Sequence, residues 1–479
     1  TIFPIDQEDL YVYQLKPGDP RRYRYKGAWE SVRVVRETIE VKSEAPRTVE
    51  LAYTRHGPVL AVDPVKNRAF AMRSVWSEPG LSGYFGSSRL LKAKTWQDFK
   101  AASNAWGAPP LNLVYADVTG AIGWAASGKT PVRENWDGLM PVPGDGRYEW
   151  KGFLKSDLLP SIENPSQGFF ATANEMNLPK DYPAEDRKIS FEWTDPSRAS
   201  RIKEVLAANA KMSVADSMAL QTDTVSAQSR RAVALLTGVK TRDRAVAAAI
   251  ALLTTWDNNE SISSAAAAIY EVWATKYLGK ATVAKVTPEA ARALVGDGHL
   301  EAVITYLEHP DSALGDNPAA AREDILVTSL AGALAELRQR LGPDVKTWAW
   351  GKLHHATWAP ESASLASTQR RAQMTVGPAP APGSASTPRA QTYRASDFNV
   401  TSGASVRMVM DVGAWDNSMM INTPGQSIDP DSPHYRDLFS LWADGKYAPM
   451  SFTRAAVDQN AEKIVRLTPA STRGRDDVR

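Results

Sequence analysis

The order of segments along the 479 residues predicts an α+β fold, formed by one domain over residues 1–479 with a helical insertion at about 195–345. Three observations carry this prediction. Alternating strand patterns dominate the first part of the chain, alanine-rich helical patterns fill the middle, and short strand patterns return afterwards. Because the two β-rich parts flank one block of helices, one interrupted body is favoured over a series of separate domains.

The first part of the chain has the alternation of apolar and polar residues that half-buried strands show. VRVVRETIEV (32–41) and TVELAYT (48–54) are rich in β-branched residues, and the turn former SEAP separates them. RHGPVL (55–60) then predicts a turn that leads into a short strand. These segments predict antiparallel neighbours in a sheet.

A helix and a hairpin follow. TWQDFKAASNAW (95–106) has helical periodicity, and Thr95 is in the position of an N-cap. LNLVYADVTGAIGWAASG (111–128) predicts two strands joined by a tight turn at Thr119 and Gly120.

Helical periodicity begins near Asp195, where DPSRASRIKEVL opens a helix that Asp195 is expected to cap. Ser213 is a second expected cap, and alanine-rich helices continue through 264–279 and 321–342. No internal repeat is visible in this block.

The last part of the chain returns to strands. VGPAPAPGSASTPRAQ (376–391) has the composition of a low-complexity loop. GASVRMVMDVG (403–413) and SMMINTPG (418–425) predict strands, and SPHYRDLFSLWADG (432–445) predicts a last short helix before the tail.

The composition narrows the class of protein. The 56 basic and 54 acidic residues give a net charge of +2, so no basic excess points to a nucleic acid partner. No apolar run is long enough to span a membrane.

The absence of cysteine excludes disulfides, thiolate catalysis and cysteine-held metals, and it suits a periplasmic or secreted protein. The 15 Trp indicate either core packing or a cleft lined with aromatic rings.

Two motifs point to other enzyme classes but lack the context that those classes need. GWAASGKT (123–130) matches the P-loop pattern, yet Pro131 and further turn formers follow where a helix N-terminus should point at phosphate. GQSID (425–429) lacks the second glycine of the serine hydrolase elbow. The sequence therefore argues against nucleotide binding and against an elbow-type hydrolase.

The histidines are interpreted as structural. His354 and His355 are adjacent, so on a strand they would face opposite sides and could not share a metal ion. His56 is expected to tie the turn of RHGPVL to the backbone.

The start of the chain leaves two questions open. Thr1 is either an N-terminal nucleophile activated by its own amine or an interior residue at which the chain has been cut. Asp6, Glu8 and Asp9 carry oxygen ligands at a spacing that suits calcium, and they also suit a solvated acidic loop.

Several segments together resemble the penicillin acylase family of N-terminal-nucleophile hydrolases, which includes penicillin amidases and acyl-homoserine-lactone acylases. Each segment alone is weak, but their common order over nearly the whole chain is specific. They are DQEDLYVYQL, RHGPVL, LNLVYADVTGAIGW, PVPGDGRYEWKG, GFFATANEMNLPKDYP, WTDPSRASRI and the long run from SVRMVMDVGAW to GKYAPMSF.

This resemblance implies a four-layer αββα sandwich and a precursor cut into an α chain and a β chain. The β chain of the family begins with a Ser that attacks the amide and whose own amine handles the proton. The present chain resembles that β chain without its first segment, so the Ser is expected upstream of Thr1 and the α chain is expected as a partner. Thr1 is then an interior residue.

The resemblance also assigns roles to residues of this chain. The Ile2 N–H and the Asn174 side chain are expected to form the oxyanion hole, because a neutral amide donor stabilises an oxyanion without acting as a competing acid. Arg198 is expected to hold Asn174 and to bias the nearby amine toward its neutral form. Leu111 and Asn112 are expected to line what remains of the acyl pocket.

The calcium site of the family maps onto the acidic cluster. The resemblance implies Asp6 and Asp9 as carboxylate ligands, Glu8 through its carbonyl, and Asp186 as a distant ligand, with one further ligand from the α chain. Calcium is therefore the one cofactor we predict; no organic cofactor is expected.

The predicted activity of the complete enzyme is hydrolysis of an N-acyl amide through an acyl-enzyme. The family suggests β-lactams with an acyl side chain, N-acyl homoserine lactones or acylated peptides as substrates, and the composition does not separate them. This chain alone is expected to be inactive. The alternative hypothesis is a family member that binds its ligand without catalysis.

Overall fold

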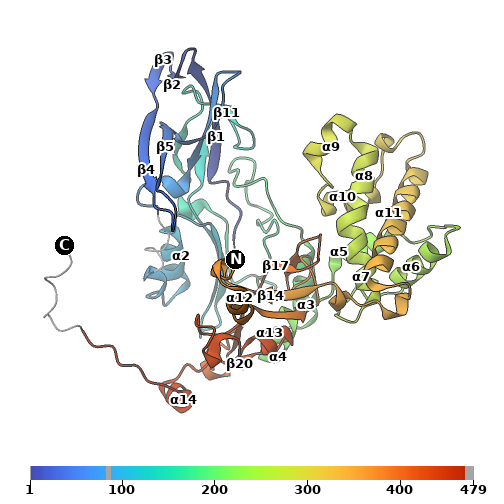
Figure 1. The fold of residues 1–479 in the computed structure, drawn as a ribbon. Helices are drawn as coiled ribbons and strands as arrows, with labels where there is room; N and C mark the ends of the chain where they lie inside the picture. Colours follow the sequence, from blue (N-terminus) through green and yellow to red (C-terminus); the bar gives the residue numbers. More distant parts are fainter. Residues whose placement is uncertain (1, 82–87, 470–479) are drawn as a thin grey trace. The chain divides into compact units, whose positions relative to one another are not determined.

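A computed structural model of the chain describes residues 2–81 and 88–469. Its contacts divide the chain into two units, Thr1–Ala210 and Lys211–Arg479. Strands prevail in the first unit, and the second unit holds most of the helices (Figure 1). This mixture of helices and sheets agrees with the predicted α+β class, while the single domain over 1–479 stays a prediction.

The first unit contains a large sheet with β1 (Glu8–Lys16) near its centre. β1 pairs antiparallel with β2 (Asp19–Tyr25) and β7 (Arg68–Ser74), and the strand order is β3-β2-β1-β7-β6-β5-β4. The short strand β11 pairs parallel with β1. The other bounds are β3 (Ala28–Ser31), β4 (Arg33–Ile39), β5 (Arg47–Thr54), β6 (Gly57–Asp63) and β11 (Val142–Pro143). β4 and β5 confirm the two strands predicted over 32–41 and 48–54.

Strand β1 has the period of two that a sheet with one buried face imposes. Asp9, Tyr11, Tyr13 and Leu15 are buried, and the residues between them are exposed or half-buried. The three apolar members join the core of this sheet, whereas Asp9 brings a carboxylate onto the same buried face.

A second, three-stranded sheet in the order β13-β9-β8 lies beside helix α2 (Trp96–Asn104). The Thr95 side chain accepts the N–H of Asp98, which confirms the predicted N-cap. Figure 1 shows α2 directly below the large sheet of the same unit. The strands are β8 (Leu111–Ala116), β9 (Ile122–Ser127) and β13 (Ser161–Glu163).

The segment with the P-loop pattern forms strands instead of a strand and a helix. After β9, the chain passes Gly128 and enters β10 (Pro131–Arg133), which pairs with β12 (Trp150–Phe153). No helix begins after Thr130 in this part of the described chain, so the segment lacks the helix N-terminus that a P-loop needs.

The predicted helical insertion agrees with the structure, because every named element between Ser197 and Leu341 is helical. The first of these helices, α3 (Ser197–Ala208), belongs to the first unit. The remaining helices are α4 (Val214–Gln221), α5 (Ala227–Ala234), α6 (Arg244–Thr254), α7 (Ala265–Trp273), α8 (Gly279–Val286), α9 (Glu289–Val295), α10 (Leu300–Glu308) and α11 (Pro318–Leu341). Figure 1 shows α7, α8 and α11 side by side, and their apolar faces share one core.

The expected caps of α3 and α4 have different outcomes. Ser213 caps α4 and forms a reciprocal capping box with Asp216. The N-cap of α3 is Pro196, one residue after the predicted Asp195. Asp195 still accepts the N–H of Ser197 at 2.6 Å, so its side chain serves the same helix from the preceding position.

The last part of the second unit consists of small sheets and short helices. β14 pairs with β15, β16 with β17, and β19 lies between β18 and β20. The bounds are β14 (His355–Trp358), α12 (Thr368–Met374), β15 (Val376–Pro380), β16 (Gln391–Tyr393), β17 (Val400–Gly403), β18 (Val406–Val409), β19 (Met419–Asn422), α13 (Phe439–Ala443), β20 (Ala448–Pro449) and α14 (Arg454–Asn460).

Two predictions in this part are right only in part. The segment 376–391, predicted as a low-complexity loop, begins with strand β15, and the irregular stretch after it buries Ser384, Thr387 and Arg389. The expected last helix over 432–445 is reduced to α13, and α14 follows it. The composition of 376–391 suggests a loop, but its hydroxyl groups bond to one another and to Ser226 inside the unit.

The second unit also buries two carboxyl groups against each other. Glu260 and Glu271 are 0% and 3% exposed, and their carboxyl groups are close enough for each to influence the pKa of the other. The Tyr393 hydroxyl donates to Glu271. Burial raises the pKa of both carboxyl groups, and the charge of Glu271 raises that of Glu260 further. Among the described residues no basic side chain forms an ion pair with either one, so the pair retains a proton.

No helix within the described residues combines the length and the apolar character that crossing a membrane requires.

Candidate active site

The Ile2 carbonyl is contacted by two of the predicted site residues of the first unit, Asn174 and Asn112. Asn174 Nδ2 donates to this oxygen at 2.8 Å, and Asn112 Nδ2 donates to it at 2.9 Å. Ile2 forms an isolated bridge with Leu111 at the start of β8. The Ile2 side chain is 62% exposed, so the cluster is open on the side of Ile2.

Asn174 lies in an irregular loop, and its backbone φ of +73° is in the left-handed region. Asparagine tolerates that region better than most residues, which suits it to this position. The loop is tied on both sides: the Thr194 N–H donates to the Asn174 carbonyl at 3.3 Å, and the Glu175 carboxylate accepts the Ala173 N–H at 2.8 Å. The side chain is therefore presented from a fixed backbone.

Arg198 determines how the Asn174 carboxamide is oriented. Its Nη2 donates to Asn174 Oδ1 at 3.1 Å, so the amide nitrogen must point toward Ile2. Arg198 stands in the first turn of α3, and burial lowers the pKa of its guanidinium. Since arginine remains charged under ordinary conditions, this bond is a charge-assisted one.

Asn112 is a buried member of the cluster. It is 4% exposed, and its Oδ1 accepts hydrogen bonds from Trp124 Nε1 at 2.7 Å and Asn177 Nδ2 at 3.0 Å. Its amide group thus lies between the Ile2 carbonyl and two donors, whereas the neighbouring Leu111 is half-buried. A lining role for Leu111 and Asn112 in the acyl pocket stays a prediction.

Sequence reasoning missed the residues that support this cluster. Trp124 and Asn177 orient Asn112, and Lys203 donates to Glu175 at 2.6 Å. Asn177 and Glu175 stand in the same short stretch, TANEMN, as Asn174. The two amides on either side of an acidic residue in this stretch were the signal in the sequence that could have pointed to these supporting residues. Thr1 lies outside the described residues, so both readings of it stay predictions.

The predicted calcium ligands lie in different surroundings. Asp9 is buried: Arg133 Nε and Trp150 Nε1 donate to its Oδ2 at 2.8 and 2.5 Å, and Trp136 donates to its Oδ1 at 3.4 Å. Burial raises the pKa of Asp6 although Arg133 opposes it. Glu8 accepts a hydrogen bond from Ser74 at 2.9 Å.

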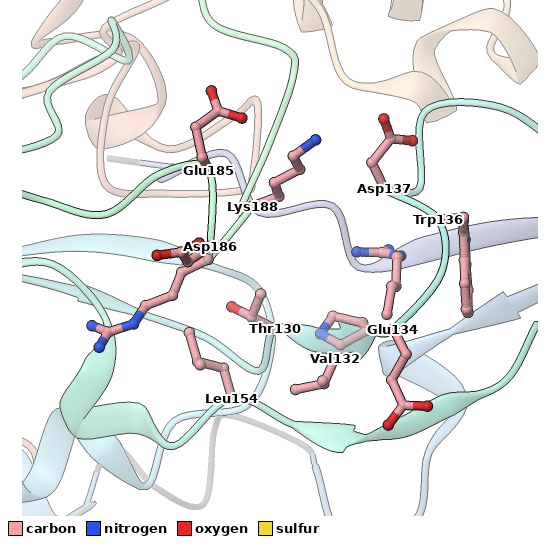
Figure 2. Close-up of a pocket in the computed structure, with 12 residues that line it drawn as sticks. Thr130, Val132, Glu134, Trp136, Asp137, Leu154, Glu185, Asp186 and Lys188 are labelled. Carbon is pink, nitrogen blue, oxygen red and sulfur yellow. The ribbon is translucent and has the colours of Figure 1, made fainter.

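Asp186 lines a cavity of 450 Å³ together with Arg133 and Lys188. Figure 2 shows Asp186 and Asp137 on opposite sides of this cavity, with Lys188 between them. Within residues 2–81 and 88–469, no three acidic or histidine side chains come close enough to hold a metal ion. Arg133 also bonds to Asp9, so the described residues do not converge on one metal position, and calcium stays a prediction.

The histidines have structural contacts. His354 is fully buried and its Nδ1 lies 2.8 Å from the Ala381 carbonyl. The interpretation of His56 needs a correction, because it is tied to side chains and not to the backbone. Its ring stacks on Tyr11, its Nδ1 bonds to Tyr13, and its Nε2 lies 3.0 Å from Glu149. Burial lowers the pKa of His56 despite that carboxylate.

Comparisons with known proteins show which family this chain resembles. A family model described as penicillin amidase matches residues 1–459. The acyl-homoserine lactone acylase QuiP of Pseudomonas aeruginosa PAO1 is 31% identical over an alignment that covers 98% of this chain and 61% of that protein. Penicillin acylase 2 proenzyme of Pseudomonas sp. strain SE83 is 30% identical, with 97% of this chain and 60% of the relative covered.

The fold is shared with a solved structure. A thermostable penicillin G acylase from Alcaligenes faecalis matches with a TM-score of 0.74 at 21% identity, over 98% of this chain and 88% of that one. The chain spans about three fifths of the length of the two curated relatives named above.

Proposed function

Because this chain belongs to the penicillin amidase family, we propose that it is the larger part of an enzyme that hydrolyses N-acyl amides. The observation that best supports this proposal is the orientation of Asn174 between Arg198 and the Ile2 carbonyl. A carboxamide nitrogen has two hydrogens. One is used by the Ile2 carbonyl, and the second is free for the oxyanion that an amide carbonyl becomes during attack.

The proposed reaction uses a nucleophile from outside this chain, namely the N-terminal Ser expected from the family. Its hydroxyl oxygen attacks the substrate carbonyl carbon and its proton passes to the α-amine. The tetrahedral oxyanion is stabilised by Asn174 and the Ile2 N–H. The C–N bond breaks, the amine leaves with that proton, and water then hydrolyses the ester and regenerates the Ser.

Relatives named as acyl-homoserine lactone acylases support N-acyl homoserine lactones as the first substrates to test. Penicillin acylase relatives support β-lactams with an acyl side chain as the second class. We also propose an α chain from the same precursor as partner, a periplasmic or secreted location, and the four-layer αββα sandwich as the complete architecture.

The test compares the complete enzyme with its Asn174→Ala variant. Release of free amine from acyl-homoserine lactones and acyl β-lactams is measured, and we expect kcat to fall by about 10²–10³-fold. Unchanged turnover would refute the oxyanion role of Asn174. A complete protein that binds these amides but is never labelled by a serine-directed acylating inhibitor would instead support the non-catalytic alternative.

We propose separately that the complete protein binds calcium, because the family resemblance implies a further ligand from the α chain. Metal analysis of the purified protein tests it directly. A preparation without calcium whose thermal unfolding is unaffected by added calcium or by a chelator would remove the proposal.

A further inference from the structure

The second unit buries two arginine side chains that have no carboxylate partner. Arg389 and Arg407 are 7% and 4% exposed. Both guanidinium groups point at the end of α13: Arg407 Nη2 donates to the Trp442 carbonyl at 2.7 Å, and Arg389 Nη2 donates to the Ala443 carbonyl at 2.6 Å. Arg389 Nη2 also reaches the Trp442 carbonyl at 3.4 Å, so the two cations share one acceptor.

Several donors of this pair are unused. Nε of Arg389 and both Nε and Nη1 of Arg407 are buried without a hydrogen-bond acceptor among the described residues. A buried donor without an acceptor costs about 1–3 kcal/mol, and more when the group is charged. Such donors in a native structure therefore indicate an acceptor that is not part of the chain.

The charges of the pair are also unbalanced. Neither arginine forms an ion pair within the part of the chain that the structure describes. Asp444 follows Ala443 at the end of α13 and its charge acts on Arg389, but Asp444 is exposed and is paired with Lys446 at 3.1 Å. The centroid of the Tyr447 ring lies 5.9 Å from the Arg407 guanidinium, and the Tyr447 hydroxyl donates to Gln221 at 2.8 Å. The hydroxyl oxygen also acts on Arg407, but as a neutral group it does not balance the charge.

Both side chains nevertheless keep their charge near neutral pH. Burial, followed by the like charge of Arg407, lowers the pKa of Arg389 only to about 10. Burial lowers the pKa of Arg407 as well. Two positive charges thus face one another inside the protein, which is costly unless a negative charge accompanies them.

We propose that Arg389 and Arg407 form a buried binding site for a small inorganic anion of the size of chloride. An anion accepts the unused N–H groups and also neutralises the repulsion, whereas a water molecule does only the first. The close packing limits the size of the ion, because the Trp442 ring centroid lies 5.3 Å from the Arg407 guanidinium and the Gly445 backbone packs against Arg389. A Cβ at Gly445 would lie 3.4 Å from Arg389 Nη1.

The site links the end of α13 to β18 and to the buried segment that carries Arg389. Its occupancy is therefore expected to stabilise the second unit without taking part in amide hydrolysis. This inference is independent of the proposed function, which concerns residues of the first unit.

The test is thermal unfolding of the purified protein at fixed pH and ionic strength, with sodium chloride replacing sodium gluconate, whose anion is too large to enter. We expect Tm to rise with chloride by roughly 2–4 °C and to saturate. Bromide should act likewise. A crystal soaked in bromide should show anomalous density beside the unused donors of Arg407.

Variants separate this site from general salt effects. In Arg407→Gln one charge and two donors are lost, so the chloride-dependent rise should disappear. The control is Arg394→Gln, because Arg394 is an exposed arginine paired with Asp397, and it should retain the full rise. If Arg407→Gln does not fold, the chloride titration of Tm and the bromide-soaked crystal of the unaltered protein still test whether the anion site exists. Equal Tm in chloride and gluconate, or bromide density absent from both guanidinium groups, overturns the proposal.

Discussion

The Ile2 cluster in the first unit and the buried polar groups of the second unit use similar residue types in opposite ways. Around Ile2, neutral amides from separate segments converge on one carbonyl, and the single guanidinium there, Arg198, has a defined acceptor. In the second unit, carboxyl groups face carboxyl groups and guanidinium groups face each other. The first arrangement orients a donor, whereas the second places groups of the same kind side by side and so requires a proton or a counterion to balance them.

This difference separates function from stability. A cluster that is open at Ile2 and pre-oriented costs little to maintain and can stabilise charge that develops on a bound molecule. Buried like-charged pairs do nothing for such a molecule, but they make the folded state depend on protons or counterions. Changes in the first cluster should therefore alter turnover, and changes in the second should alter stability.

The largest expected effect is that of Asn174→Ala, the 10²–10³-fold loss of kcat proposed above. The contrast becomes sharper with a matched control. Asn164 also has a positive φ, of 44°, and its side chain accepts the Ile122 N–H within the same unit. Asn164→Ala carries similar backbone strain but should leave kcat unchanged. A comparable loss of kcat in both variants would mean that strain in the fold, and not the oxyanion, is responsible.

The second effect concerns Glu260→Gln and should appear in stability alone. The folded state keeps Glu260 protonated, since burial raises its pKa, while the unfolded chain loses that proton above about pH 4.5. The free energy of unfolding should then fall as pH rises from that value through the folded pKa, by about 1.4 kcal/mol per pH unit for this group. Glu260→Gln removes this fall, so its Tm should overtake that of the unaltered protein at alkaline pH.

Glu336 provides the control of opposite sign. Lys276, Tyr277 and Arg340 bond to its carboxylate, and these contacts lower its pKa against the effect of burial. The contribution of Glu336 to the free energy of unfolding is present at neutral pH, and it is lost as the pH falls through the pKa of Glu336 in the folded state. Glu336→Gln should therefore lower Tm most at neutral and alkaline pH. Parallel pH profiles for the two variants would contradict the assignment of the Glu260 proton.

A smaller effect on turnover is expected for Asn112→Leu, which keeps the branched shape of the side chain but removes both sets of hydrogen bonds. One neutral hydrogen bond contributes about 0.5–1.5 kcal/mol, so kcat should fall by roughly tenfold or less through misplacement of the Ile2 peptide. KM should rise little if Asn112 acts only by positioning. A rise in KM with an unchanged kcat would instead support the predicted lining role of Asn112.

The smallest effect is expected at the surface. His434 is exposed, and Asp437 and Glu462 raise its pKa. The contribution of His434 to the free energy of unfolding is present below about pH 6.5, and it is lost as the pH rises through the pKa of His434 in the folded state. Because solvent screens these pairs, His434→Gln should give no measurable change in Tm between pH 5 and 8. A clear change would mean that exposed pairs matter as much as the buried ones.

The sequence predicted those parts of the molecule that depend on local patterns. Thr95 and Ser213 cap their helices because a hydroxyl before a helical pattern has a local partner. The strands β4 and β5 follow from alternation alone. The family resemblance, and not the local pattern, brought Asn174 and Arg198 together across 24 positions of the chain.

The parts that were missed depend on contacts between distant segments. The segment 376–391 has a loop-like composition, yet its polar groups find partners inside the second unit, as the contact between Ser386 and Ser226 shows. In the same way, nothing local marks Trp124 as the donor that fixes Asn112, or Glu260 as the partner of Glu271. Composition reports what a segment prefers by itself, and burial is decided by what surrounds it.

The alternating strand β1 has a consequence for how the length of this chain can vary. Ile2 stands only a few residues before β1, and its carbonyl is shared by amides from β8 and from the Asn174 loop. Insertion of a single residue between Phe3 and Glu8 would either turn Asp9 and Tyr11 toward solvent or displace Ile2 from its two amides. The length of this short connector is thus constrained together with its buried residues Phe3, Ile5 and Gln7.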